Sequence, residues 1–283
     1  MANTEVARMG TLYHEHVLLG ATFEPSTEGD VMRVESYPSE TGAYEKGRAY
    51  LCDLTGSTYK LVSGGAAQSL AEAVFCGKKL KVGECSWECA LTAEGAATSV
   101  ALVCRTGDNE YAVVDPTPRG DVVSAWIGFI ADIEQNGYAP YAGTKIEDAD
   151  GMLTPLLLAG DAARSVLSDY VGHVRDLPAP GEVRSLHLDK ISAVVAGVPL
   201  PGQSMPCYLV LIPPTRSATL WRSFLSFNET APIGSAALLR NERALLPWGE
   251  ALGAMDQVKP GAEALGSWGL LRDETDFVGA RSL

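Results

Sequence analysis

Paired histidines and paired cysteines are the residues of this sequence whose spacing first suggests metal chemistry. His14 and His16 lie in a segment with helical periodicity, where residues two apart point about 200° away from each other and do not share an ion. Cys85 and Cys89 lie in an expected strand, on one face with Trp87, and no second Cys or His pair follows at zinc spacing. We therefore expect no metal site, with the histidines in surface or capping roles and the cysteine face in the core.

Two polar segments have the composition of binding or capping loops. Residues 115–121, Asp-Pro-Thr-Pro-Arg-Gly-Asp, end an expected strand and open a helix, where a carboxylate can satisfy exposed N–H groups or meet a ligand. Residues 240–243, Arg-Asn-Glu-Arg, interrupt an apolar segment and are interpreted as a solvated helix face. No phosphate-loop, dinucleotide or serine-hydrolase signature occurs, so these motifs alone do not name a reaction.

The composition is that of a globular protein. The chain has 283 residues, of which 46% are apolar and 20% charged, enough for one large domain or two smaller ones. Six cysteines in apolar surroundings favour reduced thiols, and no apolar run has the length of a signal peptide or spanning helix, so we expect a cytoplasmic protein. A formal charge of −13 without a dense Lys/Arg cluster argues against nucleic acid or a membrane as partner.

The hydrophobic pattern predicts an α+β fold with mainly antiparallel sheets flanked by helices, because strands joined by short turns alternate with amphipathic helices. The polar stretch 136–151 marks a boundary between two halves, 1–140 and 152–283. Phe277 and Val278 are expected to pack against the protein, since an apolar pair is otherwise left in water. The expected helices are 5–19, 66–75, 122–133, 161–174 and 216–225, the expected strands are 59–62, 86–91, 98–104, 111–115, 154–158, 185–188, 191–198 and 208–212, and 22–56 is expected to form loops.

A series of short motifs resembles the aminomethyltransferase (glycine-cleavage T-protein) family and its folate-binding relatives, in the same order and over nearly the whole chain. The first half contributes Leu12-Tyr13-x-x-His16-x-x-x-Gly20-Ala21, then Leu51-Cys52-Asp53-Leu54-Thr55 with Leu61-Val62-Ser63-Gly64, then Leu80-Lys81-Val82-Gly83, Leu91-Thr92-Ala93-Glu94-Gly95 and Tyr111-Ala112-Val113-Val114-Asp115. The second half contributes Leu157-x-Ala159-Gly160-x-x-Ala163-Arg164-x-Val166-Leu167, Ile212-Pro213, Leu220-Trp221 and the end, Asp276-Phe277-Val278-Gly279-Ala280-Arg281-Ser282-Leu283.

The resemblance implies two interleaved α+β domains with a folate cleft between them and tetrahydrofolate as the cofactor. In that family the final motif leads into a barrel-like third domain, which this sequence lacks. The resemblance therefore also implies that one wall of the site is absent or is supplied by a partner chain.

The same resemblance implies which residues border the cleft. Trp87 and Trp248 stand where the family has tyrosines, and Asp115 stands at a folate-contacting asparagine. Arg240 keeps a family arginine. Ser99, followed by Val100, replaces a pair of aspartates that act at the folate nitrogen, so the catalytic residues are unknown and the five candidate cofactor-binding residues are Trp87, Ser99, Asp115, Arg240 and Trp248.

Two functions follow from this pattern. The first is a tetrahydrofolate-dependent one-carbon transferase that moves a methyl group, because positioning can carry that reaction without the lost acid. A small methyl donor or a carrier protein would then be the second substrate. The alternative is a catalytically degenerate folate-binding or scaffold subunit of a larger complex, because the lost carboxylates and the missing third domain both argue against catalysis.

Overall fold

The computed structural model describes residues 7–25, 30–40, 42–252 and 257–283. The chain forms two compact units, each built from two segments: unit 1 from Met1–Ser57 and Asp150–Glu242, and unit 2 from Thr58–Ala149 and Arg243–Leu283. The expected boundary at 136–151 contains one of the three points where the chain passes from one unit to the other. The units therefore differ from the halves 1–140 and 152–283, because each unit takes a segment from both.

Unit 1 is built on a mixed sheet with helices. Its six strands have the order β10-β11-β12-β9-β3-β13, and neighbours are antiparallel except for the parallel pair β13 and β3. The strands are β3 (Ala49–Asp53), β9 (Thr154–Ala159), β10 (Val183–Leu188), β11 (Ile191–Gly197), β12 (Cys207–Ile212) and β13 (Thr230–Pro232), with a separate pair β1 (Thr22–Phe23) and β2 (Val34–Ser36). The helices are α1 (Tyr13–Leu18), α4 (Ala163–Ser168), α5 (Pro214–Phe224), α6 (Ser235–Leu245) and the short η1 (Val174–Asp176).

Unit 2 carries a five-stranded sheet that is antiparallel throughout, in the order β5-β6-β7-β4-β8. Its strands are β4 (Thr58–Ser63), β5 (Cys85–Leu91), β6 (Ala97–Gly107), β7 (Glu110–Asp115) and β8 (Lys145–Asp148). The helices are α2 (Ala67–Val74), α3 (Gly120–Ala131), α7 (Gly249–Leu252), α8 (Gly261–Ser267) and η2 (Ala280–Ser282). The α+β class and the predominance of antiparallel strands expected from the sequence are confirmed.

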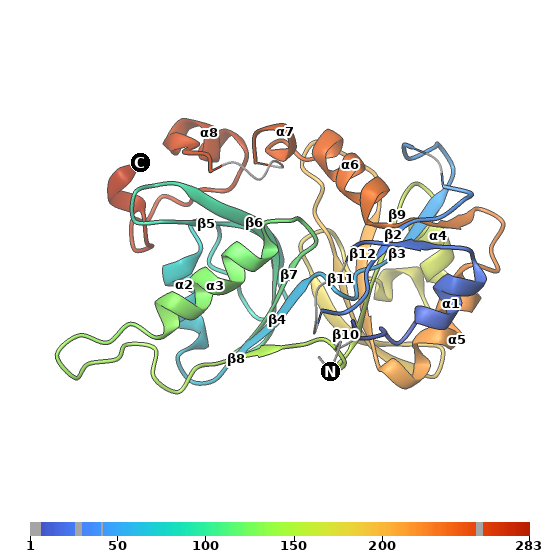
Figure 1. Cartoon of the computed structure of the whole chain (residues 1–283), viewed down its shortest axis with the longest axis horizontal. Coiled ribbons are helices and arrows are strands. Elements are labelled where there is room, and N and C mark those ends of the chain that lie inside the picture. The colour runs from blue at the N-terminus through green and yellow to red at the C-terminus, as the bar shows by residue number, and fades with distance from the viewer. Residues whose placement is uncertain (1–6, 26–29, 41, 253–256) are drawn as a thin grey trace, which may run out of the picture. The chain divides into compact units, whose positions relative to one another are not determined.

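Helices α2 and α3 lie side by side against one face of the unit 2 sheet (Figure 1). Leu70 of α2 and Ile127 of α3 belong to one buried cluster with Val103 and Val113, which point from the sheet toward the helices. Burial of such side chains stabilises this layer by roughly 1.5 to 3 kcal/mol each. The sheet therefore has one face that is closed by helices.

Two expectations about the N-terminal part of unit 1 are wrong. The segment 22–56, expected as loops, contains β1, β2 and β3, and all five residues of β3 are buried. Because β3 is covered on both faces, its sequence lacks the alternation that identifies a half-exposed strand, and its partners β9 and β13 come from distant parts of the chain.

Helix α1 is shorter than expected. It begins at Tyr13 and not at residue 5, and residues 5 and 6 lie outside the described ranges. Arg8 forms an extended bridge with Val31, and a side chain at Gly10 would come within 2.9 Å of Thr55 Cγ2, so this part of the chain packs as an extended segment. Helix α4 is also shorter than the expected 161–174. No helix in the described ranges is long and apolar enough to span a bilayer.

The last residues of the chain are attached to α2. The Arg272 N–H donates to the Cys76 carbonyl at 2.9 Å, and the Val278 N–H donates to the Ala73 carbonyl at 2.8 Å. Phe277 is buried and Val278 packs against the core of unit 2, which confirms the expected packing of this apolar pair.

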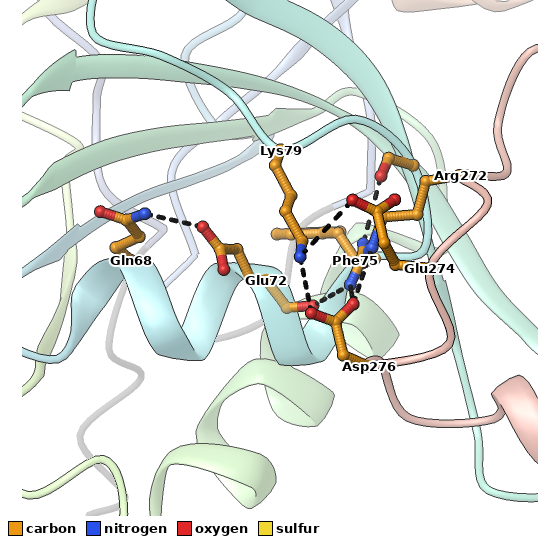
Figure 2. A network of polar contacts seen from close by, with 8 residues as sticks. Gln68, Glu72, Phe75, Lys79, Arg272, Glu274 and Asp276 are labelled. Atoms are coloured by element: carbon orange, nitrogen blue, oxygen red, sulfur yellow. Dashed lines mark hydrogen bonds and ion pairs between the residues drawn. The ribbon is translucent and has the colours of Figure 1, made fainter.

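A buried arginine holds this attachment together (Figure 2). Arg272 Nη2 donates to the Glu72 carbonyl at 2.6 Å, and Nη1 donates to the carbonyls of Phe75 and, at 3.1 Å, Gly77. Carbonyls at the C-terminal end of a helix lack partners within the helix, so the guanidinium caps α2. Its charge is balanced by Asp276 at 2.8 Å. Lys79, 2.6 Å from the same carboxyl, and then Arg272 lower the pKa of Asp276 to about 2.

We predict that Arg272→Met lowers the free energy of unfolding by about 2 to 4 kcal/mol, because several charge-assisted bonds to buried carbonyls are lost together. The matched control is Arg222→Met, because the Arg222 side chain is 66% exposed and paired with Glu15, and it should lower the stability far less than Arg272→Met does. Urea unfolding of the three proteins measures the difference. Equal effects of the two substitutions would show that Arg272 does not anchor this segment.

Candidate functional site

Four of the five candidate residues lie in unit 2 and the fifth lies in unit 1. Trp87 is on β5, Ser99 on β6, Asp115 at the end of β7, and Trp248 directly before α7. Arg240 is on α6 in unit 1, where its Nη1 donates to the Gly42 carbonyl at 3.1 Å. Arg240 and Arg243 are exposed, as expected for a solvated helix face, but the neighbouring Asn241 is buried.

The two tryptophans contact each other. The rings of Trp87 and Trp248 have centroids 5.9 Å apart and an interplanar angle of 63°, an edge-to-face arrangement, and both residues are less than one-tenth exposed. Trp87 pairs with Leu102 across β5 and β6, so both side chains point to the same face of the sheet. This face carries Cys85, Cys89 and Val100 as well, and neither β5 nor β6 places a carboxylate on it.

Ser99 and Asp115 form a second polar cluster. Ser99 Oγ donates to Asp115 Oδ2 at 2.5 Å, and the Thr117 N–H donates to Asp115 Oδ1 at 2.9 Å. Asp115 is fully buried. A carboxylate that binds the N–H two residues later stabilises the turn into the following helix. Asp115 therefore shapes the turn before α3, whose N-cap residue, Arg119, makes no side-chain cap bond.

The sheet separates these two clusters. Ser99 is three residues from Leu102, and Asp115 follows Val114, the partner of Leu102 on β7, so Ser99 and Asp115 point to the face opposite Trp87. That opposite face is the one covered by α2 and α3. Within unit 2 the structure thus brings Trp87 together with Trp248 and Ser99 together with Asp115, but it does not bring the two pairs together.

Glu88 is a buried acid that the sequence analysis did not single out. It is 1% exposed, on the helix-covered face, and its Oε1 accepts a hydrogen bond from the Lys78 N–H at 3.1 Å. Gly77 lies so close that an added Cβ would come within 2.2 Å of Oε2. Burial raises the pKa of Glu88 to about 8, against the opposing effects of bonds from Ser86 and Lys78.

The surroundings of Glu88 leave room for little more than one water molecule. A cavity of about 10 Å³ lies between Glu88, Lys78, Lys79 and Arg272.

The sequence pattern predicts that Cys85, Trp87 and Cys89 lie on the core face of the strand, which leaves Glu88 on the other face. The sequence carries no signal for the burial of Glu88, because apolar and polar residues alternate from Cys85 to Cys89 as in a strand with one exposed face, whereas both faces of β5 are covered.

His16 contradicts the surface or capping role expected for it. The residue is 3% exposed, with Nε2 at 2.9 Å from Asp53 Oδ2 and Nδ1 at 2.8 Å from the Tyr37 hydroxyl. The ring also meets the edge of Trp221 at 5.0 Å between centroids. Helix α1 begins only at Tyr13, so His16 lies one turn into a short helix that packs on the sheet. Its ring faces the core. One buried polar network links three parts of unit 1: His16 on α1, Tyr37 directly after β2, and Asp53 on β3.

The thiols lie in the interior of the protein. All six cysteines are free and buried, as expected. A hydrogen bond with Cys76, and then burial, holds the pKa of Cys89 well above its usual value, and Cys85 has the same effect on Cys104. A thiol with a raised pKa is protonated at neutral pH and reacts poorly. In the described ranges, no three His, Cys, Asp or Glu side chains gather in a way that could hold a metal ion.

The fold matches that of a solved enzyme. Over 98% of this chain and 74% of that one, the structure superposes on glycine cleavage system aminomethyltransferase T from Bartonella henselae with a TM-score of 0.72, at 16% sequence identity. The chain has an aminomethyltransferase-like fold. A heterotetrameric sarcosine oxidase from Corynebacterium sp. U-96 aligns with a TM-score of 0.41 and 14% identity over 77% of this chain and 93% of that one, too low a score to carry an argument. No protein-family model and no curated protein matches the sequence.

We predict that the stability of the wild-type protein decreases from about pH 4.5 to about pH 8 relative to that of Glu88→Gln. The folded state binds the Glu88 proton more tightly than the unfolded state, so stability is lost as the pH rises through the folded pKa, with a slope approaching about 1.4 kcal/mol per pH unit. Urea unfolding across this range provides the measurement.

Glu84→Gln is the matched control for this prediction. The Lys81 N–H, and then Lys78, lower the pKa of Glu84, so its replacement should leave the decline between pH 4.5 and 8 in place. If the free energy of unfolding of the wild type and of Glu88→Gln changed with pH in parallel, Glu88 would not be protonated in the folded state as predicted.

Proposed function

We propose that this protein binds a tetrahydrofolate and acts as a one-carbon transferase that moves a methyl group. The observation that carries the proposal is the contact between Trp87 and Trp248, within a fold like that of an aminomethyltransferase. An indole can stack on a flat heterocycle such as a pterin, and aromatic contacts contribute about 0.5 to 1.5 kcal/mol beyond the area that they bury. The proposed second substrate is a small methyl donor or a carrier protein, and a partner chain is proposed to complete the site.

The fit of a pterin to the five candidate residues is partial. The tryptophan pair provides two indole rings, each less than one-tenth exposed, but Ser99 and Asp115 point to the other face of the sheet and are bonded to each other. A ring stacked on the indoles would therefore not share its amino group with Asp115. Without a charged hydrogen-bond partner we expect binding to be weaker by about 1.5 to 3 kcal/mol than with one.

Methyl transfer suits these residues better than aminomethyl transfer. General acid–base help at the folate nitrogen is typically worth about 10² to 10⁴ in rate, and neither Ser99 nor Val100 provides it. Glu88 has a pKa suited to proton transfer, but it is enclosed on the helix-covered face. Holding two reactants in the correct geometry can by itself lower a barrier considerably, so a methyl transfer that depends on positioning remains compatible with the site.

The alternative is a catalytically degenerate folate-binding or scaffold subunit. It is favoured by a specific observation: Glu88 and Asp115 are buried on the face opposite Trp87, all six thiols are buried, and Cys89 and Cys104 are held protonated. Both functions require folate binding, but only the transferase turns over a methyl donor. Binding and activity must therefore be measured separately.

The binding prediction is that Trp248→Ala weakens the affinity for tetrahydrofolate about tenfold, the equivalent of about 1.4 kcal/mol, whereas Trp248→Phe keeps most of it because the aromatic surface remains. Calorimetric titration is preferable to fluorescence here because the variants remove a tryptophan. Trp126→Ala, on α3, is the matched control and should bind like the wild type. An unchanged affinity in Trp248→Ala would reject the tryptophan pair as the binding surface.

The activity prediction is that the purified protein shows no aminomethyl transfer from a lipoylated carrier, because neither Ser99 nor Val100 supplies an acid, and β5 and β6 place no carboxylate on the face of Trp87. Methyl transfer is measured with methylcobalamin as the probe donor and tetrahydrofolate as the acceptor, followed by the appearance of methyltetrahydrofolate. Turnover that Trp248→Ala reduces would support the transferase. Folate binding without methyl transfer would favour the scaffold subunit, and glycine-cleavage turnover would overturn both.

A further inference from the structure

Helix α3 carries apolar residues on two sides. Val123, Ile127 and Ile130 face the core beneath the helix and are at most 2% exposed. A second series, Val122, Trp126 and Phe129, recurs at steps of four and three residues, which places it along one line of the helix surface, and Ile133 follows directly after the C-cap residue Asp132. The sequence analysis grouped both series into one apolar helix.

We call Val122, Trp126, Phe129 and Ile133 together the outer stripe. Three of its members are exposed, and the fourth, Trp126, is partly buried against the core of unit 2. Val122 is 42%, Phe129 61% and Ile133 38% exposed. The Trp126 and Phe129 rings stack with centroids 5.4 Å apart and an interplanar angle of 18°, so they form one continuous aromatic surface. Single exposed apolar residues are ordinary, but a contiguous exposed stripe on one helix marks an interaction surface.

The charged residues within α3 and the segment that follows it, up to residue 144, all have one sign. Asp121 lies at its N-terminal end, and Asp132 and Glu134 lie at its C-terminal end. Lys and Arg do not occur between residues 120 and 144. Arg119, directly before the helix, is buried, with Nε at 2.5 Å from the Thr98 carbonyl and Nη2 at 2.9 Å from the Ala97 carbonyl, so its charge is directed into the protein.

We propose that the outer stripe of α3 is a docking surface for an amphipathic helix of a partner protein whose apolar face is flanked by Lys and Arg. Apolar anchors of such a helix would cover Trp126 and Phe129. Its basic residues would meet Asp121 at one end and Asp132 and Glu134 at the other. Helix-on-helix recognition of this kind uses anchors at steps of three and four residues, and complementary charges orient the partner and speed its association.

The same charges argue against a second copy of this chain as the occupant. In either orientation, two outer stripes packed on each other would bring acidic ends together, because the stripe is acidic at both ends. The formal charge of −13 adds to that repulsion. An anionic membrane surface is disfavoured for the same reason.

The test uses two synthetic, dye-labelled helical peptides with an identical leucine face, one with lysines and one with glutamates on the polar face. Fluorescence anisotropy should show binding of the lysine peptide, binding at least about tenfold weaker for the glutamate peptide, and weakening of the lysine peptide by salt. Phe129→Ser should reduce the affinity for the lysine peptide about tenfold, as expected for the loss of an aromatic anchor. Leu18→Ser, which removes a leucine that is 76% exposed on α1, is the matched control and should change nothing.

A second variant tests the charges separately. Asp132→Lys combined with Glu134→Lys alters only exposed residues, so the protein should stay folded while its affinity for the lysine peptide falls. Equal affinity for the two peptides, no binding of the lysine peptide at roughly 1 mM, or an unchanged affinity in Phe129→Ser would overturn the proposal. Sedimentation that shows a wild-type dimer abolished by Phe129→Ser would assign the surface to a second copy and overturn it as well.

Discussion

The alternation of side chains across the five-stranded antiparallel sheet of unit 2 is the constraint on which the candidate site depends. Every second residue of a strand points to the same face, so one residue of offset moves a side chain from the helix-covered face to the opposite one. Trp87 lies on one face because it pairs with Leu102. Ser99 and Asp115 lie on the other, together with Glu88. The chemistry of unit 2 is therefore divided between a buried tryptophan pair on one face of the sheet and an enclosed polar layer on the other.

The enclosed layer has the electrostatics of a protein core. Burial keeps Glu88 protonated near neutral pH, while Asp115 is stabilised by donors from Ser99 and Thr117. The same division explains why methyl transfer or folate binding without catalysis fits the protein better than a reaction that requires an acid beside the tryptophan pair.

Helix α3 shows how one element can serve both the fold and recognition. Its inner residues close the core over the sheet, and its outer stripe leaves aromatic surface in water between acidic ends. Arg272 has a comparable double effect on α2, since one guanidinium both satisfies the carbonyls at the helix end and attaches the last segment of the chain. In both cases the folding interaction also sets which surface remains available.

The sequence by itself determined the α+β class, helices α2 and α3 and strands β4 to β7 of unit 2, and the burial of Phe277, because these follow from local periodicity and from the cost of exposing apolar groups. Tertiary structure alone decided the placement of β3 and the surroundings of His16. Both depend on partners far away in the sequence, which local patterns do not encode. Tertiary structure also decided which candidate residues share a face of the sheet, since strand register depends on how β5, β6 and β7 pair in space.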